Sequence, residues 1–124
     1  MQVSRCKLVK QQVASPEEDI FKVSKKMGIS KSIIVVEDKK PVGIITMRDI
    51  VSRVLAKGKD PKKTLVKEVM TKPVFCAKEN DELEKIGKTM LEKDYLTVPV
   101  LDKKGQYKGI LTMRQVMFSL KRNK

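Results

Sequence analysis

The sequence predicts a mixed α/β protein made of two copies of one strand–helix–strand–strand–helix unit. The first observation is a repeat, because GIITMRDI at 43–50 returns as GILTMRQV at 109–116. The second is the helical spacing of apolar residues upstream of each motif, and the third is a run of β-branched residues between that helix and the motif. Since the chain has only 124 residues, neither copy alone can bury its apolar surface well. We therefore expect the two copies to pack together about an approximate two-fold axis.

Each copy is expected to begin with a short strand, at 12–14 in the first copy and at 74–77 in the second. An amphipathic helix follows, because apolar residues recur at positions i, i+3 and i+7, which share one face of a helix. The spacing predicts that this face is buried. Its residues are Ile20, Val23 and Met27 in the first copy and Leu83, Ile86 and Met90 in the second.

Two further strands and a closing helix complete each copy. The strands are expected at 32–39 and 41–46 in the first copy and at 96–103 and 107–112 in the second, since Ile, Val and Thr favour the pleated backbone. The closing helices have apolar stripes, which are Ile50, Val51, Val54 and Leu55 in the first copy and Val116, Met117 and Leu120 in the second. Flexible methionine side chains fill irregular cores, and we expect this role for Met27, Met90, Met113 and Met117.

The limits of the copies follow from the breaks between these elements. The first copy is expected at 1–58 and the second at 65–124, with a linker at 59–64 that a glycine precedes and a proline interrupts. A short helical lead-in is expected at 65–70, and 3–7 repeats its pattern weakly.

The residue types present argue against an enzyme and against a metal site. The chain contains no histidine, which is the commonest general base and a frequent metal ligand. Sequence motifs of hydrolases, zinc proteases and nucleotide-phosphate loops are absent as well. We therefore expect no catalytic residues and no metal.

Cysteine content and hydropathy favour a cytoplasmic protein. Cys6 and Cys76 are too few for a disulfide framework, so two buried thiols are the preferred interpretation and a single bridge the alternative. No apolar run is long enough to span a membrane, and the first residues lack the apolar stretch of a signal peptide.

The charge of the chain is strongly positive. There are 28 Lys and Arg against 15 Asp and Glu, a net charge of +13, which favours anionic partners that include nucleic acid. The alternative is a lysine-rich solvated surface, since the lysines are spread along the whole chain. Aromatic residues make up only 4% of the sequence, so a platform that stacks single-stranded bases is not expected.

The T-x-x-D motif has two interpretations. Thr46 and Asp49 have the spacing of a helix capping box, and Thr112 with Gln115 serves equally well, which explains both copies without a ligand. Alternatively, a carboxylate at position 49 accepts hydrogen bonds from the two hydroxyls of a ribose. An arginine in the first turn, where it opposes the helix dipole, then meets a phosphate. Gln115 has no charge and would lose most of the ribose preference.

These motifs resemble a known family. PVGIITMRDI at 41–50 and VPVLDKKGQYKGILTM at 98–113, in two copies with the same element order, look like a tandem pair of cystathionine-β-synthase (CBS) domains over almost the whole chain. The resemblance implies a regulatory module that binds AMP, ADP, ATP or S-adenosylmethionine between the copies without catalysis. It also implies a homodimer of pairs and an effector protein that reads the ligand.

The resemblance further implies two ligand sites, each with the motif of one copy facing the first and second strands of the other. The first site would comprise Thr46, Arg48, Asp49, Val74, Phe75, Ala77, Leu96, Thr97 and Pro99. The second, weaker site would comprise Gln12, Ala14, Ser32, Ile33, Thr112, Arg114 and Gln115. Two other functions are consistent with the sequence, namely a basic nucleic-acid-binding protein and a CBS assembly module without a ligand.

Overall fold

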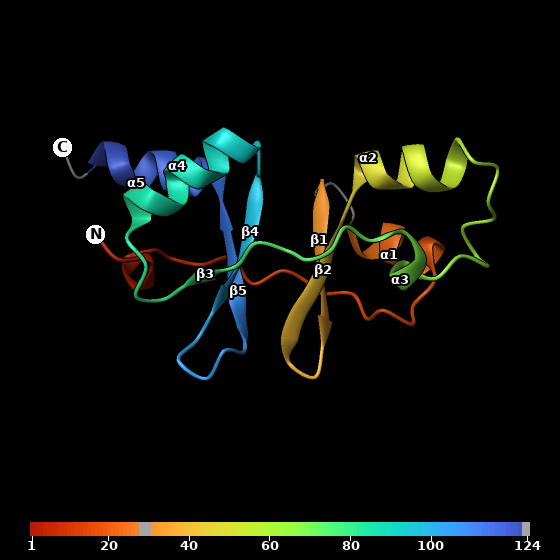
Figure 1. The fold of residues 1–124 in the computed structure, drawn as a ribbon, viewed down its shortest axis with the longest axis horizontal. Helices are drawn as coiled ribbons and strands as arrows, with labels where there is room; N and C mark the ends of the chain where they lie inside the picture. The colour runs from red at the N-terminus through yellow and green to blue at the C-terminus, as the bar shows by residue number, and fades with distance from the viewer. Residues whose placement is uncertain (28–30, 123–124) are drawn as a thin grey trace. The chain divides into compact units, whose positions relative to one another are not determined.

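The computed structural model describes residues 1–27 and 31–122, and Figure 1 shows their fold. After the opening strand of each copy, helices and strands follow in the predicted order. The elements are the 3₁₀ helix η1 (Val3–Arg5), α1 (Ile20–Met27), β1 (Ser32–Glu37), β2 (Lys40–Thr46), α2 (Met47–Ile50), the π-helical η2 (Val51–Leu55), α3 (Val66–Val69), β3 (Ala77–Lys78), α4 (Leu83–Lys93), β4 (Thr97–Leu101), β5 (Tyr107–Thr112) and α5 (Met113–Arg122).

The chain forms two compact units that do not follow the limits of the sequence repeat. Unit 1 consists of Met1–Lys10 with Phe75–Lys124, and unit 2 consists of Gln11–Val74. The first ten residues therefore pack with the second copy, and the segment around α3 packs with the first copy. We call these two stretches, Met1–Lys10 and 65–74, the crossed segments.

Unit 2 is built on the antiparallel hairpin of β1 and β2, in which Ser32 pairs with Thr46 and Ile34 with Ile44. The strand expected at 12–14 is reduced to a single residue, Ala14, which bridges in parallel to β1. Its N–H donates to the Ile34 carbonyl at 2.9 Å. The pairing ends there because the chain turns at Pro16, which has no N–H to donate.

The predicted apolar face of α1 is buried in unit 2. Ile20 and Val23 are fully buried and Met27 is 5% exposed, so the spacing identified the face correctly. Removing such aliphatic side chains from water contributes about 1.5–3 kcal/mol each. They share the core with residues of the hairpin, the closing helix and α3, among them Ile33, Ile45, Val54 and Val66.

Unit 1 is built on the sheet β3–β4–β5, with β4 and β5 antiparallel and β3 parallel to β4. The strand expected at 74–77 forms only at its end, as β3. Helices α4 and α5 pack on one side of this sheet, as Figure 1 shows. Their core includes the predicted positions Leu83, Ile86 and Met90 together with Val98, Leu111 and Val116.

Each crossed segment is held on a motif strand by a pair of backbone hydrogen bonds. Val9 exchanges two such bonds with Ile110 of β5, at 3.1 and 2.9 Å, and Thr71 exchanges two with Ile44 of β2, at 2.9 and 3.0 Å. The glycine of each GI(I/L)T motif permits this close approach. A Cβ at Gly109 would lie 3.2 Å from the Val9 carbonyl oxygen.

The structure corrects several expectations about single residues. Met117 was expected in the core, but it is 52% exposed because it lies beside the buried stripe of Val116 on α5 rather than on it. Two residues of the predicted stripe on the first closing helix, Val51 and Leu55, are likewise 56% exposed each. Cys6 is a buried thiol as expected, whereas the Cys76 thiol is only half-buried. Among the described residues, none of the helices combines the length and apolar character needed to cross a bilayer.

Candidate functional site

The motif of the first copy forms the predicted capping box at the start of α2. The Asp49 N–H donates to Thr46 Oγ1 at 3.1 Å, and the Thr46 N–H donates to Asp49 Oδ2 at 3.0 Å. Thr46 is the last residue of β2, so the cap fixes the turn from strand to helix. It also draws the Asp49 carboxylate inward, and the residue is only 7% exposed.

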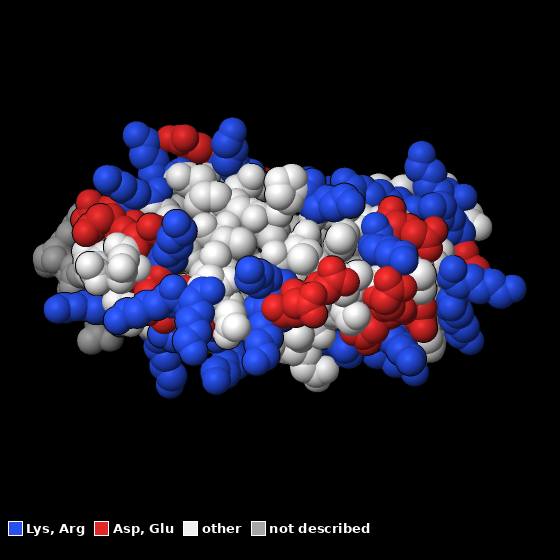
Figure 2. Space-filling view, turned by 60° about the horizontal axis from the view of Figure 1, so that its bottom comes forward, with Lys and Arg blue, Asp and Glu red and all other residues white. Residues whose placement is uncertain are grey.

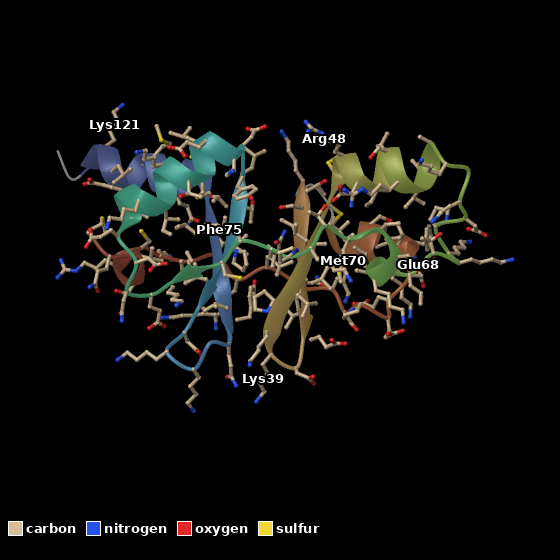
Figure 3. All side chains as sticks on the ribbon, in the orientation of Figure 1. Lys39, Arg48, Glu68, Met70, Phe75 and Lys121 are labelled. Carbon is tan, nitrogen blue, oxygen red and sulfur yellow. The ribbon has the colours of Figure 1, made fainter. Side chains whose placement is uncertain are left out.

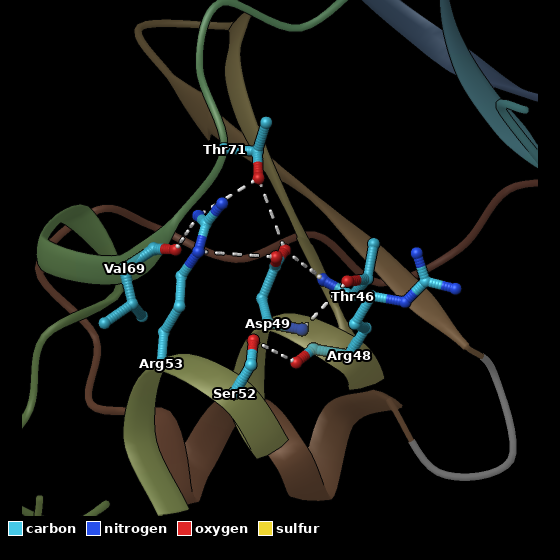
Figure 4. A network of polar contacts seen from close by, with 7 residues as sticks. All are labelled: Thr46, Arg48, Asp49, Ser52, Arg53, Val69 and Thr71. Atoms are coloured by element: carbon cyan, nitrogen blue, oxygen red, sulfur yellow. Dashed lines mark hydrogen bonds and ion pairs between the residues drawn. The ribbon is translucent and has the colours of Figure 1, made fainter. Parts of the chain in front are cut away.

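Asp49 takes part in a larger polar network that joins the closing helix to a crossed segment (Figure 4). The Thr71 hydroxyl donates to Asp49 Oδ2 at 3.5 Å. Arg53, one helical turn after Asp49, places its Nε 3.7 Å from Asp49 Oδ1. Its Nη1 donates to the Val69 carbonyl at 2.8 Å and to Thr71 Oγ1 at 3.2 Å. This acidic side chain therefore lies next to a cation that is engaged mainly elsewhere.

Arg48 is the exposed member of the motif. Its guanidinium points away from the Asp49 carboxylate in Figure 4 and away from the hairpin in Figure 3. Among the described residues, the Arg48 side chain has no carboxylate within ion-pair distance. It is available to an anion from outside the protein, such as a phosphate.

The motif of the second copy closes a similar cap with a neutral side chain. The Gln115 N–H donates to Thr112 Oγ1 at 3.2 Å, and Gln115 Oε1 accepts from the Thr112 N–H at 3.1 Å. The Gln115 amide Nε2 then donates to the Lys7 carbonyl of the other crossed segment. Its polar groups are therefore occupied within unit 1.

The residues predicted to face the first motif lie mostly in unit 1, where they differ in exposure. Phe75 stacks on Tyr95 with ring centroids 5.8 Å apart, and Leu96 is 56% exposed. Figure 3 labels Phe75 on this unit. Ala77 and Pro99 are buried in the core, so a ligand contact at these two positions would involve backbone groups.

The residues predicted to face the second motif lie in unit 2. Gln12 is exposed, while Ala14 and Ile33 are buried in the core. The Ser32 carbonyl accepts from Gln11 Nε2 at 2.9 Å. The other amide atom, Gln11 Oε1, is a buried acceptor without a partner among the described residues.

Each predicted site thus draws its residues from both units. Within unit 2 the structure brings together Thr46 and Asp49, and within unit 1 it brings together Thr112 and Gln115. Sequence reasoning missed Arg53, although its spacing of four residues from Asp49 is a known signal for a helical ion pair. It also missed Thr71, which reaches Asp49 only because its segment crosses to the other copy.

A thiol and a phenol outside the network have raised pKa values. Burial raises the pKa of the Cys76 thiol, and burial also raises the pKa of Tyr107. Both shifts disfavour the ionised, nucleophilic form, so neither group is an activated nucleophile. In the part of the chain that the structure describes, no cluster of His, Cys, Asp or Glu could hold a metal ion.

Comparison with known proteins identifies the family. The CBS-domain model matches residues 7–56 and again residues 66–122, which together make up most of the chain. The chain belongs to the CBS-domain family. The two matches correspond to the two sequence repeats, so the capping motifs described above are the T-x-x-D and T-x-x-Q segments of two CBS domains.

Three known proteins are similar to this CBS pair in sequence or in fold. An uncharacterized protein of Methanopyrus kandleri is 35% identical over 106 residues, which cover 83% of this chain and 54% of that protein. A Methanocaldococcus jannaschii protein, described as a proposed archaeal homologue of γ-AMPK, has a structure with 28% identity and a TM-score of 0.77 over 90% of this chain and 44% of that one. CBSX2 of Arabidopsis thaliana, solved in complex with AMP, has 19% identity and a TM-score of 0.81 over 98% and 97% of the two chains. This chain therefore spans about half the length of the first relative.

Proposed function

We propose that this CBS pair is a regulatory module that binds an adenosine-containing ligand of the AMP, ADP or ATP class between its two repeats and performs no catalysis itself. S-adenosylmethionine belongs to the same ligand class. The observation that carries the proposal is the Asp49 carboxylate, which lies in the same motif as the exposed Arg48. Within the described part of the chain, its Oδ1 has only a long contact to Arg53.

The chemistry of these two side chains suits a nucleotide. A carboxylate oxygen accepts hydrogen bonds from vicinal hydroxyls, and charge-assisted bonds of this kind are about twice as strong as neutral ones. A guanidinium binds phosphate through parallel N–H donors. Phe75, Tyr95 and Leu96 supply apolar and aromatic surface that suits a base, and Thr97 begins the adjoining strand. The Gln115 site would bind the same ligand more weakly, since its amide is already occupied.

Two relatives support this ligand class. CBSX2 was solved with AMP, and the Methanocaldococcus protein is described as a proposed homologue of γ-AMPK. Their ligands and roles are their own, but the shared fold and family make an adenine nucleotide the first ligand to test on this chain.

Exposed apolar residues support a further part of the proposal, a homodimer whose packing the ligand biases and an effector protein reads. They lie on the closing helix of each repeat, with Met47, Val51 and Leu55 in unit 2 and Met117 and Phe118 in unit 1. The last two line a hollow of about 810 Å³ together with Leu91. Apolar side chains gathered in this way are typical of a protein–protein contact.

A thermal-shift screen tests the proposed ligand class. The purified chain would be heated with AMP, ADP, ATP, S-adenosylmethionine or NAD, and any ligand that binds the native state raises the unfolding midpoint. We expect at least one adenosine ligand to do so, and we expect mass spectrometry to find the same molecule in the purified protein. No shift with any of the five compounds would contradict the proposal and favour an assembly module without a ligand.

The charge distribution favours the nucleotide over a nucleic acid. Unit 1 contains 14 Lys and Arg against 7 Asp and Glu, and unit 2 contains 14 against 8, so the excess is shared evenly. On the face drawn in Figure 2, basic and acidic side chains are interspersed. Affinity for nucleic acid would fall steeply with salt, because binding releases counterions. Filter binding of a labelled oligonucleotide at two salt concentrations would separate the two functions, and tight, salt-sensitive binding would favour nucleic acid.

A further inference from the structure

The hydrogen-bond acceptors of Asp49 are unequally used. Oδ2 accepts from the Thr46 N–H at 3.0 Å and from the Thr71 hydroxyl at 3.5 Å. Among the described residues, Oδ1 faces only Arg53 Nε, at 3.7 Å, which is beyond the usual range for an N–H···O hydrogen bond. The side chain keeps 10% of its surface exposed. Oδ1 is therefore the oxygen that a ligand hydroxyl would find unfilled.

Arg53 makes its short hydrogen bonds to the crossed segment and not to the Asp49 carboxylate. Its Nη1 lies 2.8 Å from the Val69 carbonyl oxygen and 3.2 Å from Thr71 Oγ1. The planar guanidinium has donors in fixed directions, so these bonds also fix where Nε lies. Arg53 thus ties the crossed segment to the closing helix and places a positive charge beside Asp49 without saturating it (Figure 4).

In the second repeat, one residue both closes the helix cap and binds the crossed segment. Thr71 bridges to Ile44, and Val9 bridges to Ile110, the equivalent residue of the second motif. Thr71 and Val9 are therefore equivalent, so Lys7, two residues before Val9, is the counterpart of Val69, two residues before Thr71. In the second repeat the Lys7 carbonyl is bound by Gln115, the counterpart of Asp49. The counterpart of Arg53 is Ser119, which is too short to reach that carbonyl and instead lies 3.8 Å from the Cys6 thiol.

The two repeats therefore use different residues to close the helix cap and to bind the crossed segment. Gln115 closes the cap with its oxygen, which also accepts from the Thr112 hydroxyl at 3.3 Å, and binds the crossed segment with its nitrogen, so no acceptor remains for a ligand. In the first repeat Asp49 closes the cap and Arg53 binds the crossed segment. This division leaves Oδ1 unfilled.

We propose that Arg53 is the positioning residue of the Asp49 site. Because Arg53 binds the Val69 carbonyl and the Thr71 hydroxyl, one oxygen of Asp49 remains available to accept hydrogen bonds from ligand hydroxyls. Arg53 also fixes the direction of that oxygen. The inference rests on the proposed function, because it specifies how that site would recognise a ribose. It also makes a separate statement about the fold, namely that the pair Asp49 and Arg53 is equivalent to the pair Gln115 and Ser119.

Binding of AMP and of 2′-deoxy-AMP, measured by calorimetry, tests the positioning role. We expect the wild-type chain to prefer AMP by about tenfold, the value of one charge-assisted hydrogen bond. Arg53→Ser should bring the ratio of the two dissociation constants close to one, and Arg53→Lys, which keeps the charge but not the fork, should give an intermediate ratio. The matched control is Arg48→Ser, which should weaken both ligands equally and leave the ratio unchanged. An unchanged ratio in both Arg53 variants would overturn the proposal.

Urea unfolding without ligand tests the equivalence of the two pairs. Arg53→Ser should lower the midpoint because the Val69 carbonyl loses its donor. The double variant D49Q/R53S should recover most of the loss, since a glutamine at position 49 can bind that carbonyl as Gln115 binds Lys7. A double variant no more stable than Arg53→Ser would overturn this equivalence. Absence of AMP binding by the wild-type chain would overturn the proposed function and the ribose role, while the unfolding comparison would still decide the equivalence.

Discussion

At the scale of single residues, Asp49 and Gln115 show how one fold requirement admits two chemistries. Both side chains accept a backbone N–H and close the cap of a helix. They differ in the group that is left over, which is an acceptor oxygen at Asp49 and a donor nitrogen at Gln115. A donor finds a carbonyl in the crossed segment, whereas an acceptor needs a donor from elsewhere. We infer that this remaining group makes the two repeats unequal toward a ligand.

Glu18 gives a prediction about pH at the same scale. Burial by itself raises the pKa of Glu18, but the hydrogen bonds from Lys26 and from the Ser15 N–H, with the charges of Lys26 and Lys22, outweigh it and lower the pKa. A lowered pKa in the folded state means that Glu18 contributes stability above its unfolded value of 4.5 and that this contribution is lost as the pH falls through the folded value. Glu18→Gln should therefore destabilise the chain at neutral pH and flatten its loss of stability in acid.

Urea unfolding at neutral pH and at a pH below the pKa of Glu18 checks this prediction. Glu84→Gln makes the same chemical change at an exposed position of α4 and serves as the control for the loss of one carboxylate. The account of Glu18 would be wrong if Glu18→Gln lost as much stability in acid as the wild-type chain does.

The sequence predicted the helix caps, whose partners are local. The capping boxes were predictable because a cap involves residues three positions apart. The role of Arg53 was not, because its short bond goes to Val69, 16 positions away, through a crossing that no local pattern reveals. For the same reason the second bond of Gln115, to Lys7, could not be foreseen.

At the scale of elements, the motif glycines explain why the crossed segments fit. Gly109→Ala would place a Cβ 3.2 Å from the Val9 carbonyl oxygen and 3.2 Å from Leu8 Cβ, and neither of these atoms can move without the backbone. We expect a loss of about 1–3 kcal/mol in the free energy of unfolding, the usual cost of overpacking. Gly43→Ala would place a Cβ 2.6 Å from Met70 Sδ and 3.1 Å from the Thr71 carbonyl oxygen, so we expect a loss of at least the same size there.

Chemical denaturation of the two alanine variants measures both losses. Equal stability of Gly109→Ala and the wild-type chain would show that the Leu8–Val9 backbone is not held against β5 as described.

Elements with strong periodicity were predicted well, and weakly paired ones were not. The apolar faces of α1 and α4 and the hairpins of both repeats follow directly from the sequence pattern. The opening strands were predicted too long, since backbone pairing there depends on a neighbouring strand and not on side-chain pattern. Met117 shows the remaining weakness, because in a helix that is apolar on more than one side the pattern does not reveal which side is buried.

At the scale of the whole molecule, the crossing of the two lead-in segments separates sequence repeat from compact unit. A division by repeat assigns Met1–Lys10 to the first CBS domain, yet these residues complete unit 1, which holds the second. Val3 is fully buried in the core of unit 1, and Val9 hydrogen-bonds to β5.

Deletion of Met1–Lys10 should therefore loosen the second repeat more than the first. Hydrogen exchange of the truncated chain should show faster exchange in β4 and β5, because β5 loses its two hydrogen bonds with Val9 and the core loses Val3 and Cys6. Amides of β1 and β2, which belong to unit 2, serve as the internal control. Faster exchange confined to β1 and β2 would contradict this description of the units.

We propose that the carboxylate of Asp49 binds the sugar hydroxyls of an adenine nucleotide, and the rest of the proposed function depends on this contact. The most direct measurement is calorimetric titration of AMP into the wild-type chain, Asp49→Asn and Asp38→Asn. Asp49→Asn can keep the cap while replacing the unfilled acceptor with a donor, and Asp38→Asn makes the same chemical change in the exposed β1–β2 turn, where asparagine tolerates the left-handed backbone. We predict saturable binding to the wild-type chain and to Asp38→Asn, and at least about tenfold weaker binding to Asp49→Asn. Equal affinity of all three proteins for AMP would contradict the claim.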